Sequence, residues 1–239
     1  MVDRAQKRPV PKAPPPKPQT RILVVEDHPL VRRGIIDMVG HEEDLVVCGE
    51  AATAAEAMKL VESQKPHLVI ADVTLGDGNG IDLIRQIRAL GGNLPVLVLS
   101  MREESLFAER AIRAGAQGYV SKSAPSERLI SAIRQVLRGE LALSQHIAER
   151  LIRRAAGLHA PNPQSAAIPE NLSDRELEIF EMFGRGLTVA EIARRLRISA
   201  KTVQAHRENI KAKLELGTST EVTRYAALWT DGAGGPIER

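Results

Sequence analysis

Three carboxylates follow two strand-like runs in the first third of the chain. Glu26 and Asp27 come directly after the apolar run Ile22–Val25, and Asp72 follows the apolar run Leu68–Ala71. Continuous apolarity is typical of strands buried on both faces of a parallel sheet, and parallel strands end at one edge. Ligands bind at that edge in open α/β sheets. We therefore expect the three carboxylates to meet in one pocket.

Carboxylates gathered in one pocket repel one another unless a cation lies among them. Oxygen ligands favour a hard cation, and Mg²⁺ is the one that suits a site for phosphate-like groups. Two more polar side chains end later strand-like runs, because Ser100 follows Val96–Leu99 and Lys122 follows Gly118–Val120. A hydroxyl and an ammonium group at this edge can bind the oxygens of an anion formed on Asp72.

Strand-like runs and helix-like segments alternate from residue 21 to residue 140. Five runs, the second of them Leu45–Cys48, are each followed by a segment with helical spacing of apolar residues. This alternation predicts an α/β fold, a five-stranded parallel doubly wound sheet with helices on both faces. The expected helices span residues 29–39, 53–64, 80–90, 103–114 and 125–138.

Charge is unevenly distributed along the 239 residues. Residues 1–20 hold five Lys or Arg, one acid and six prolines, which predicts a disordered basic tail. Residues 21–141 carry 14 Lys and Arg against 17 acids, whereas residues 194–213 carry seven against one. The basic segment near the C-terminus predicts contact with nucleic acid at that end of the chain.

Composition disfavours membrane and secreted proteins. No apolar run approaches the length of a membrane span, and the N-terminal segment lacks the apolar core of a secretory signal. We therefore expect a cytoplasmic protein without membrane insertion. The single cysteine, Cys48, cannot form an internal disulfide or a thiolate cluster.

A second, smaller domain is expected after a linker. Residues 141–171 contain prolines, glycine and an amphipathic segment over 144–156, so we expect a linker with one helix. Residues 172–231 predict four short helices in an all-α domain, and residues 232–239 form a tail. Capping boxes and one N-cap mark the helix starts. They are Ser173 with Glu176, Thr188 with Glu191, Thr218 with Glu221, and Ser199.

The third of these helices, residues 200–214, carries most of the basic residues. Val203, Ile210 and Leu214 share one side at helical spacing and are expected to face the core. Small alanines on the opposite side allow close approach to base edges. That side carries Lys201, Ala205, Glu208 and Ala212, flanked by Gln204 and Lys211 and by Thr202, Asn209 and Lys213.

Three side chains of this helix can form hydrogen bonds with base edges, and the flanking residues can contact phosphates. Lys201 can contact guanine or phosphate, and Gln204 can reach adenine. Glu208 can accept a hydrogen bond from cytosine, or it can pair with a nearby lysine instead.

Residues 21–138 resemble the CheY-like receiver domain of bacterial two-component response regulators. The resemblance rests on Glu26, Asp27, Asp72, Ser100, Tyr119 and Lys122, each at the expected strand end. It implies phosphoryl transfer from a sensor histidine kinase to Asp72. It also implies Mg²⁺ held by Glu26, Asp27, Asp72 and the backbone of Thr74. Ser100 and Lys122 would bind the phosphoryl group. The movement of Ser100 would vacate space under the helix over 103–114, and Tyr119 would rotate into it, which would switch the face formed by residues 103–122.

The chain departs from this family in the loop after Asp72. The family usually has a proline four residues after the phosphoacceptor, and Gly76 stands there instead. A glycine in place of proline predicts a less pre-organised loop, and this affects the expected phosphorylation kinetics.

Residues 172–229 resemble the LuxR/NarL-type helix-turn-helix domain, chiefly over TVAEIARRLRISAKTVQAHRENIKAKL. The resemblance implies that the helix over 188–196 supports a recognition helix, residues 200–214, in the major groove of double-stranded DNA. His206 and Arg207 match the motif but lie nearer the core, so we expect them to contact the DNA backbone. Paired half-sites require two recognition helices, which predicts a homodimer on DNA.

The two resemblances together imply a transcriptional response regulator of the NarL/FixJ family. Such a protein is not an enzyme, although it can slowly remove the phosphoryl group from its own aspartate. Two alternatives remain. An Mg²⁺-dependent phosphohydrolase would use Asp72 as nucleophile, but Thr74 stands where such enzymes commonly place a second acid. An adaptor or constitutive DNA binder would keep both folds and never cycle phosphate.

Overall fold

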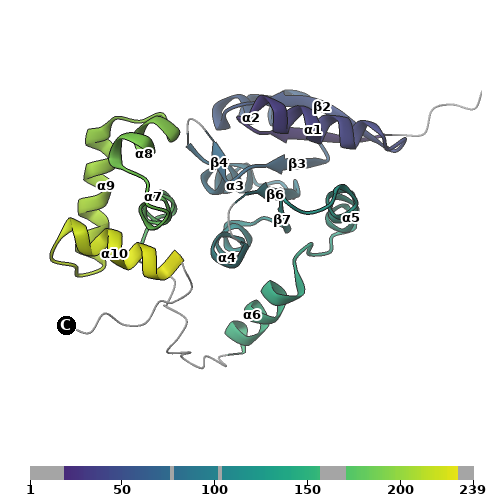
Figure 1. The fold of residues 1–239 in the computed structure, drawn as a ribbon. Helices are drawn as coiled ribbons and strands as arrows, with labels where there is room; N and C mark the ends of the chain where they lie inside the picture. The colour runs from purple at the N-terminus through teal and green to yellow at the C-terminus, as the bar shows by residue number, and fades with distance from the viewer. Residues whose placement is uncertain (1–18, 76–77, 102–103, 157–170, 231–239) are drawn as a thin grey trace, which may run out of the picture.

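The computed structural model describes residues 19–75, 78–101, 104–156 and 171–230. A sheet covered by helices makes up the N-terminal part, and a group of helices makes up the C-terminal part (Figure 1). Within the described residues, no helix is both long enough and apolar enough to cross a membrane.

Five parallel strands form the sheet in the order β2-β1-β3-β6-β7. Their inward residues are apolar and buried, as the sequence predicts for a sheet covered on both faces. The predicted α/β fold is therefore confirmed. The strands are β1 (Thr20–Val25), β2 (Leu45–Ala51), β3 (Leu68–Ala71), β6 (Val96–Ser100) and β7 (Gly118–Ser121).

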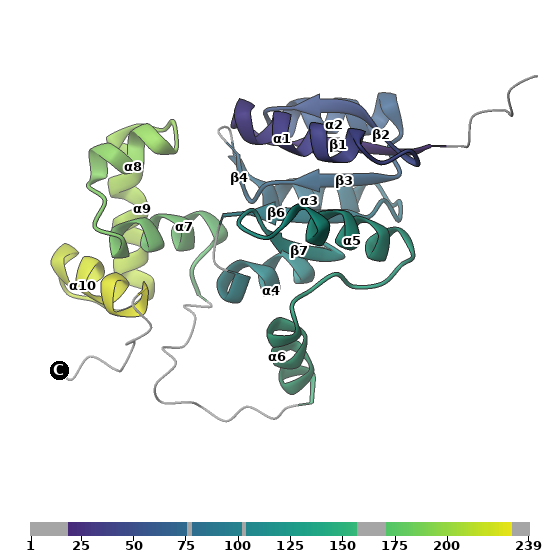
Figure 2. The same ribbon diagram turned by 45° about the vertical axis from the view of Figure 1, so that its right-hand side comes forward.

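The helices cover the two faces of the sheet with separate apolar clusters. On one face, α1 (Pro29–Gly40) and α5 (Ser126–Leu137) bury residues such as Ile35 and Ile133. On the other face, α2 (Ala54–Gln64), α3 (Gly80–Ala89) and α4 (Glu104–Ala114) pack in the second cluster. Figure 2 shows the same layers from a second side.

The segment after Asp72 was expected to be a loop, and this expectation is partly wrong. Two short strands, β4 (Thr74–Leu75) and β5 (Gly78–Asn79), pair antiparallel. A pair of two-residue strands is too short to leave a periodic signal in the sequence. Gly76, the predicted point of departure from the family, lies outside the described residues.

Four helices form the C-terminal group, in agreement with the sequence pattern. They are α7 (Asp174–Gly184), α8 (Val189–Arg195), α9 (Ala200–Lys213) and α10 (Ser219–Thr230). The capping boxes at Ser173 and Thr188 and the N-cap at Ser199 all form their predicted hydrogen bonds. Phe180 of α7 packs against Tyr225 and Trp229 of α10, with ring centroids 5.8 and 5.4 Å apart.

Helix α7 also joins the C-terminal group to the sheet layer. Asp174 at its start accepts hydrogen bonds from Arg110 of α4 and Arg85 of α3, each at 2.9 Å. Arg110 donates a further bond of 2.9 Å to the carbonyl of Leu172. The expected linker helix is α6 (Gln145–Ala155), which packs against α4.

Candidate functional site

Asp72 lies at the carboxyl edge of the sheet, directly after the central strand β3. The strand register pairs Ala71 with Val25, so the residues after these two come together. The Asp72 N–H donates to the carbonyl of Val25 at 3.0 Å, and the side chain is only 5% exposed. The predicted position of this carboxylate is therefore confirmed.

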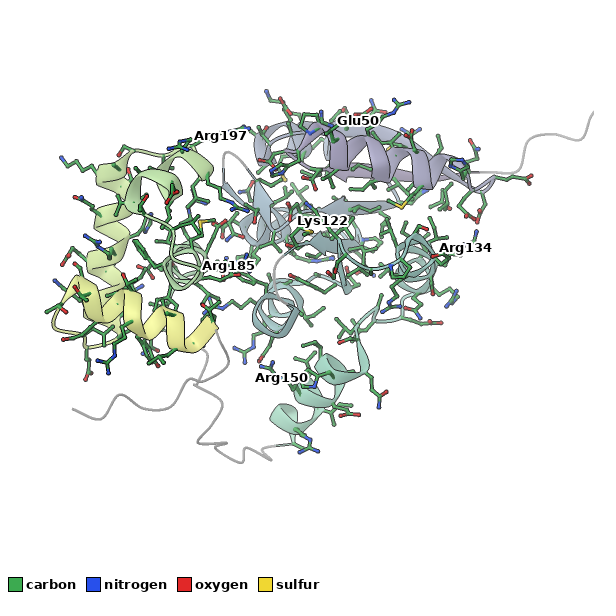
Figure 3. The ribbon with its side chains drawn as sticks, in the orientation of Figure 1. Glu50, Lys122, Arg134, Arg150, Arg185 and Arg197 are labelled. Atoms are coloured by element: carbon green, nitrogen blue, oxygen red, sulfur yellow. The ribbon has the colours of Figure 1, made fainter. Side chains whose placement is uncertain are left out.

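Lys122 connects the two most buried carboxylates of this edge. It follows β7, and its N–H donates to the carbonyl of Ser100 at 2.9 Å. Its Nζ lies 2.7 Å from Asp72 Oδ2 and 2.5 Å from Glu26 Oε2. Figure 3 shows the lysine close to the strands, inside the layer of helices. One ammonium group thus faces two carboxylates, at the edge of the sheet where the sequence predicts it.

Glu26 is almost fully buried, at 1% exposure. Burial raises the pKa of its carboxyl, and the neighbouring Asp72 carboxylate raises it further. The hydrogen bond and charge of Lys122 lower the pKa but do not cancel these effects. A nearby cation stabilises the charged form of a buried carboxylate that lies next to another carboxylate.

The pocket fits a hard divalent cation. One oxygen each of Glu26, Asp27 and Asp72 lies within 4.8 Å of the others, together with a nitrogen of His28. Asp72 Oδ1 is buried and has no hydrogen-bond partner among the described residues. A buried carboxylate oxygen without a partner is costly unless a cation or donor satisfies it. Carboxylate oxygens suit Mg²⁺, and the role of the Thr74 backbone stays a prediction.

Ser100 and Tyr119 lie on neighbouring strands at the same end of the sheet. Val98 of β6 pairs with Tyr119 of β7, and Ser100 pairs with Ser121. Ser100 is fully buried, and the Tyr119 ring is 1% exposed. The ring shares a buried cluster with Phe107 of α4, so it already occupies the inward position. The expected rotation into that position therefore has no counterpart in this structure.

Helix α9 presents the exposed face that the sequence predicts. Val203 and Ile210 are buried against the other helices, while Leu214 is only partly buried. Lys201, Thr202, Gln204, Ala205, Glu208, Asn209, Ala212 and Lys213 are exposed.

Two ion pairs of α9 restrict the predicted DNA-binding set. Glu208 pairs with Lys211, which is the alternative left open for this acid. Lys213 pairs with the buried carboxylate of Glu176 at 2.6 Å. These pairs would have to open or share their charges for contact with DNA.

His206 and Arg207 lie on the core side of α9, as expected. The guanidinium of Arg207 stands 5.7 Å above the Phe183 ring of α7. Burial and the charge of Arg175 lower the pKa of His206. Both side chains are half-buried, which leaves room for a contact at the edge of the helix.

Sequence reasoning missed two parts of this arrangement. His28 reaches the carboxylate pocket, and its position next to the acidic pair was the available signal. The anchoring of α7 by Arg85 and Arg110 joins residues far apart in the chain, which no local pattern reveals.

Two features together define a class of protein. One is the acidic pocket with a lysine at the edge of a five-stranded parallel sheet, and the other is the C-terminal group of helices, in which α9 exposes basic side chains. That class is the response regulator with a DNA-binding output domain. Family comparison agrees over both parts of the chain. Residues 22–134 match the family "Response regulator receiver domain", and residues 170–226 match "Bacterial regulatory proteins, luxR family".

The chain belongs to this family of two-part transcription regulators. Response regulator GacA of Pseudomonas aeruginosa is 35% identical over 86% of this chain and 94% of its own length. The nitrate/nitrite response regulator NarL of Escherichia coli is 32% identical over 87% of this chain and 93% of its own.

Solved structures share the fold. A LuxR-family response regulator from Aurantimonas is 37% identical, with a TM-score of 0.54, over 58% of this chain and 99% of its own. RcsB of Salmonella enterica, bound to promoter rprA with a BeF3⁻ phosphomimetic, is 23% identical, with a TM-score of 0.58. That match covers 87% of this chain and 98% of the RcsB chain.

Proposed function

We propose that Asp72 accepts a phosphoryl group from a sensor histidine kinase and that this charge controls binding of α9 to DNA. The observation that carries the proposal is the pocket at the sheet edge, where Lys122 faces Asp72 at 2.7 Å and Asp72 Oδ1 has no described partner. Phosphoryl transfer depends mainly on position and charge, and this pocket supplies both.

The residues of the pocket have separate roles in this proposal. Glu26, Asp27, Asp72 and the backbone of Thr74 hold Mg²⁺, which neutralises charge on the transferring group. Lys122 binds a phosphoryl oxygen and already lies beside the acceptor. Ser100 donates to the added phosphoryl group. Since Tyr119 is already inside, the change it transmits falls on α4.

In this proposal, the chain divides into functional parts at the boundaries expected from the sequence. A receiver domain spans residues 21–140, a linker with α6 spans 141–171, and a DNA-binding domain spans 172–231. Residues 1–20 and 232–239 are tails. We propose a cytoplasmic localisation, because the protein would have to meet both its kinase partner and DNA.

Helix α9 is the proposed recognition helix. Its exposed residues suit the major groove, with Ala205 allowing close approach and Lys201 and Gln204 reading base edges. RcsB, a structural neighbour, is described in complex with promoter DNA. The full proposed set is Lys201, Thr202, Gln204, Ala205, His206, Arg207, Glu208, Lys211 and Lys213. Two such helices on paired half-sites imply a homodimer on DNA.

Labelling with acetyl phosphate tests the first step. Incubated with Mg²⁺, the full chain is expected to gain one phosphoryl group by intact mass, and Asp72→Asn is expected to gain none. The adduct then decays slowly through autodephosphorylation. Rapid continuous release of phosphate would support a phosphohydrolase, and absence of any adduct would support a constitutive DNA binder. Either outcome would overturn the proposal.

A further inference from the structure

His28 belongs to the carboxylate pocket without being part of the proposed Mg²⁺ set. Its Nδ1 lies 2.7 Å from Asp27 Oδ1 and 3.2 Å from Glu26 Oε1. One ligand atom from each of Glu26, Asp27, His28 and Asp72 lies within 4.8 Å of the other three. The pocket therefore holds a nitrogen donor beside its oxygens.

Lys122 divides the oxygens of the pocket into two sets. Its ammonium group faces Asp72 Oδ2 and Glu26 Oε2. Asp72 Oδ1 is buried and accepts no hydrogen bond from the described residues. Glu26 Oε1 accepts the hydrogen bond of the His28 N–H and is also the oxygen next to the ring nitrogen of His28. The imidazole thus lies beside the Glu26 oxygen that does not face the lysine.

The backbone holds His28 in place while the ring stays accessible. The His28 N–H donates to Glu26 Oε1 at 3.1 Å, and Arg32 of α1 donates to the Glu26 carbonyl at 2.7 Å. Carboxylate oxygens only accept hydrogen bonds, so with these contacts Nδ1 carries the ring proton toward Asp27 and Glu26. The side chain is 66% exposed, so the proton can move to Nε2, in contact with water, when Nδ1 turns its lone pair to a cation.

We propose that His28 is a fourth side-chain ligand of the metal site, beside Glu26, Asp27 and Asp72, and that it gives the pocket a selective affinity for borderline first-row divalent cations, the class of Mn²⁺, Co²⁺ and Zn²⁺. The inference rests on the cation site of the proposed function. Imidazole nitrogen binds these ions well and adds little for Mg²⁺, which prefers oxygen. The nitrogen donor therefore changes which ion the pocket favours.

Titration of the full chain with Co²⁺ and, separately, with Mg²⁺ tests this assignment. Calorimetry gives both affinities, and the visible absorption of bound Co²⁺ reports whether nitrogen is a ligand. His28→Gln is expected to lower Co²⁺ affinity by about tenfold or more, on the scale of losing a metal-orienting group, and to change the Co²⁺ spectrum. Its Mg²⁺ affinity is expected to change by less than about twofold.

His146→Gln, an exposed histidine of α6, is the matched control and is expected to change neither affinity. An unchanged Co²⁺ affinity and spectrum in His28→Gln would overturn the inference. Equal losses for Co²⁺ and Mg²⁺ would also overturn it, because His28 would then only shape the pocket. A wrong assignment of the cation site itself would give a different result. In that case neither the unaltered chain nor Asp27→Asn would bind Mg²⁺.

Discussion

Lys122 pairs one ammonium group with two buried carboxylates, at 7% exposure of its own side chain. Charges buried in this way are tolerated only while they are paired. The lysine therefore has a structural role as well as the proposed role in binding a phosphoryl oxygen. The two roles can be separated, because stability is measurable without any phosphoryl donor.

Lys122→Met leaves Glu26 and Asp72 without their shared partner. We expect it to lower the free energy of unfolding by about 3 kcal/mol in metal-free buffer, since breaking a buried ion pair strands a charge. Urea denaturation with EDTA measures this. Lys59→Met, at an exposed position of α2, is the control, and equal urea midpoints for the two variants would contradict the account.

Glu26 should make stability depend on pH in the opposite sense to an ordinary ion-paired acid. Its pKa in the folded chain is raised above 4.5, so the folded state binds the proton more tightly than the unfolded state. The stabilisation is complete below pH 4.5 and is lost as pH rises through the folded pKa.

Glu26→Gln removes this titrating group. Between pH 4.5 and pH 8 without metal, its unfolding free energy should fall less with rising pH than that of the unaltered chain. Urea midpoints measured across this range provide the comparison. Parallel pH profiles would show that Glu26 titrates normally.

Two helices carry a glycine where another segment of the chain comes too close for a side chain. A Cβ on Gly80, at the start of α3, would lie 1.9 Å from the Asp72 carbonyl oxygen. A Cβ on Gly184, at the end of α7, would lie 2.1 Å from Thr230 Oγ1 and 2.5 Å from the Ala226 carbonyl oxygen. Both positions therefore exclude any side chain.

Gly184→Ala forces α7 and α10 apart. We expect a loss of about 2 kcal/mol of unfolding free energy in the C-terminal helices, from overpacking. Gly34→Ala in α1 meets no atom within 4 Å and is expected to be neutral or stabilising by up to about 1 kcal/mol. Thermal unfolding followed by circular dichroism compares them, and similar melting temperatures would contradict the packing argument.

Elements with local patterns could be predicted from the sequence. The strands and helices of the sheet layer leave periodic apolar signals, and Ser173, Thr188 and Ser199 mark helix starts by their chemistry. The β4–β5 pair is too short to leave such a signal. The positions of Glu26, Asp72 and Lys122 at one edge could be predicted because these residues follow strand ends, which share one edge in a parallel sheet.

Contacts between distant segments could not be predicted in this way. The pairing of Lys213 with Glu176 and the anchoring of Asp174 by Arg110 depend on how whole helices pack. The inward position of Tyr119 depends on the space under α4, which the sequence does not specify.

In the whole molecule, α7 lies between the sheet layer and α9, the proposed recognition helix (Figures 1 and 2). Asp174 is 8% exposed and holds Arg110 of α4 and Arg85 of α3. The exposed residues of α9 are not used in this contact. Helix α4, next to the sheet edge that carries Asp72, is thereby connected to the C-terminal helices through the Asp174 carboxylate and the Leu172 carbonyl.

Asp174→Asn should loosen the contact between the two parts, because the amide keeps the shape of the side chain but loses its charge. We expect a larger radius of gyration by small-angle X-ray scattering, and the same from Arg110→Met. Asp82→Asn is the matched control, since Asp82 also pairs with Arg85 but at an exposed position within α3. Identical scattering curves for Asp174→Asn and the unaltered chain would contradict this role.

The charge that a phosphoryl group adds at Asp72 is proposed to control the binding of α9 to DNA. The most direct measurement selects a DNA site from random sequence and then titrates it with the full chain by fluorescence anisotropy, with and without acetyl phosphate and Mg²⁺. We expect tighter binding by the phosphorylated chain and no such gain in Asp72→Asn. Equal affinity of the unaltered chain in both states would contradict it.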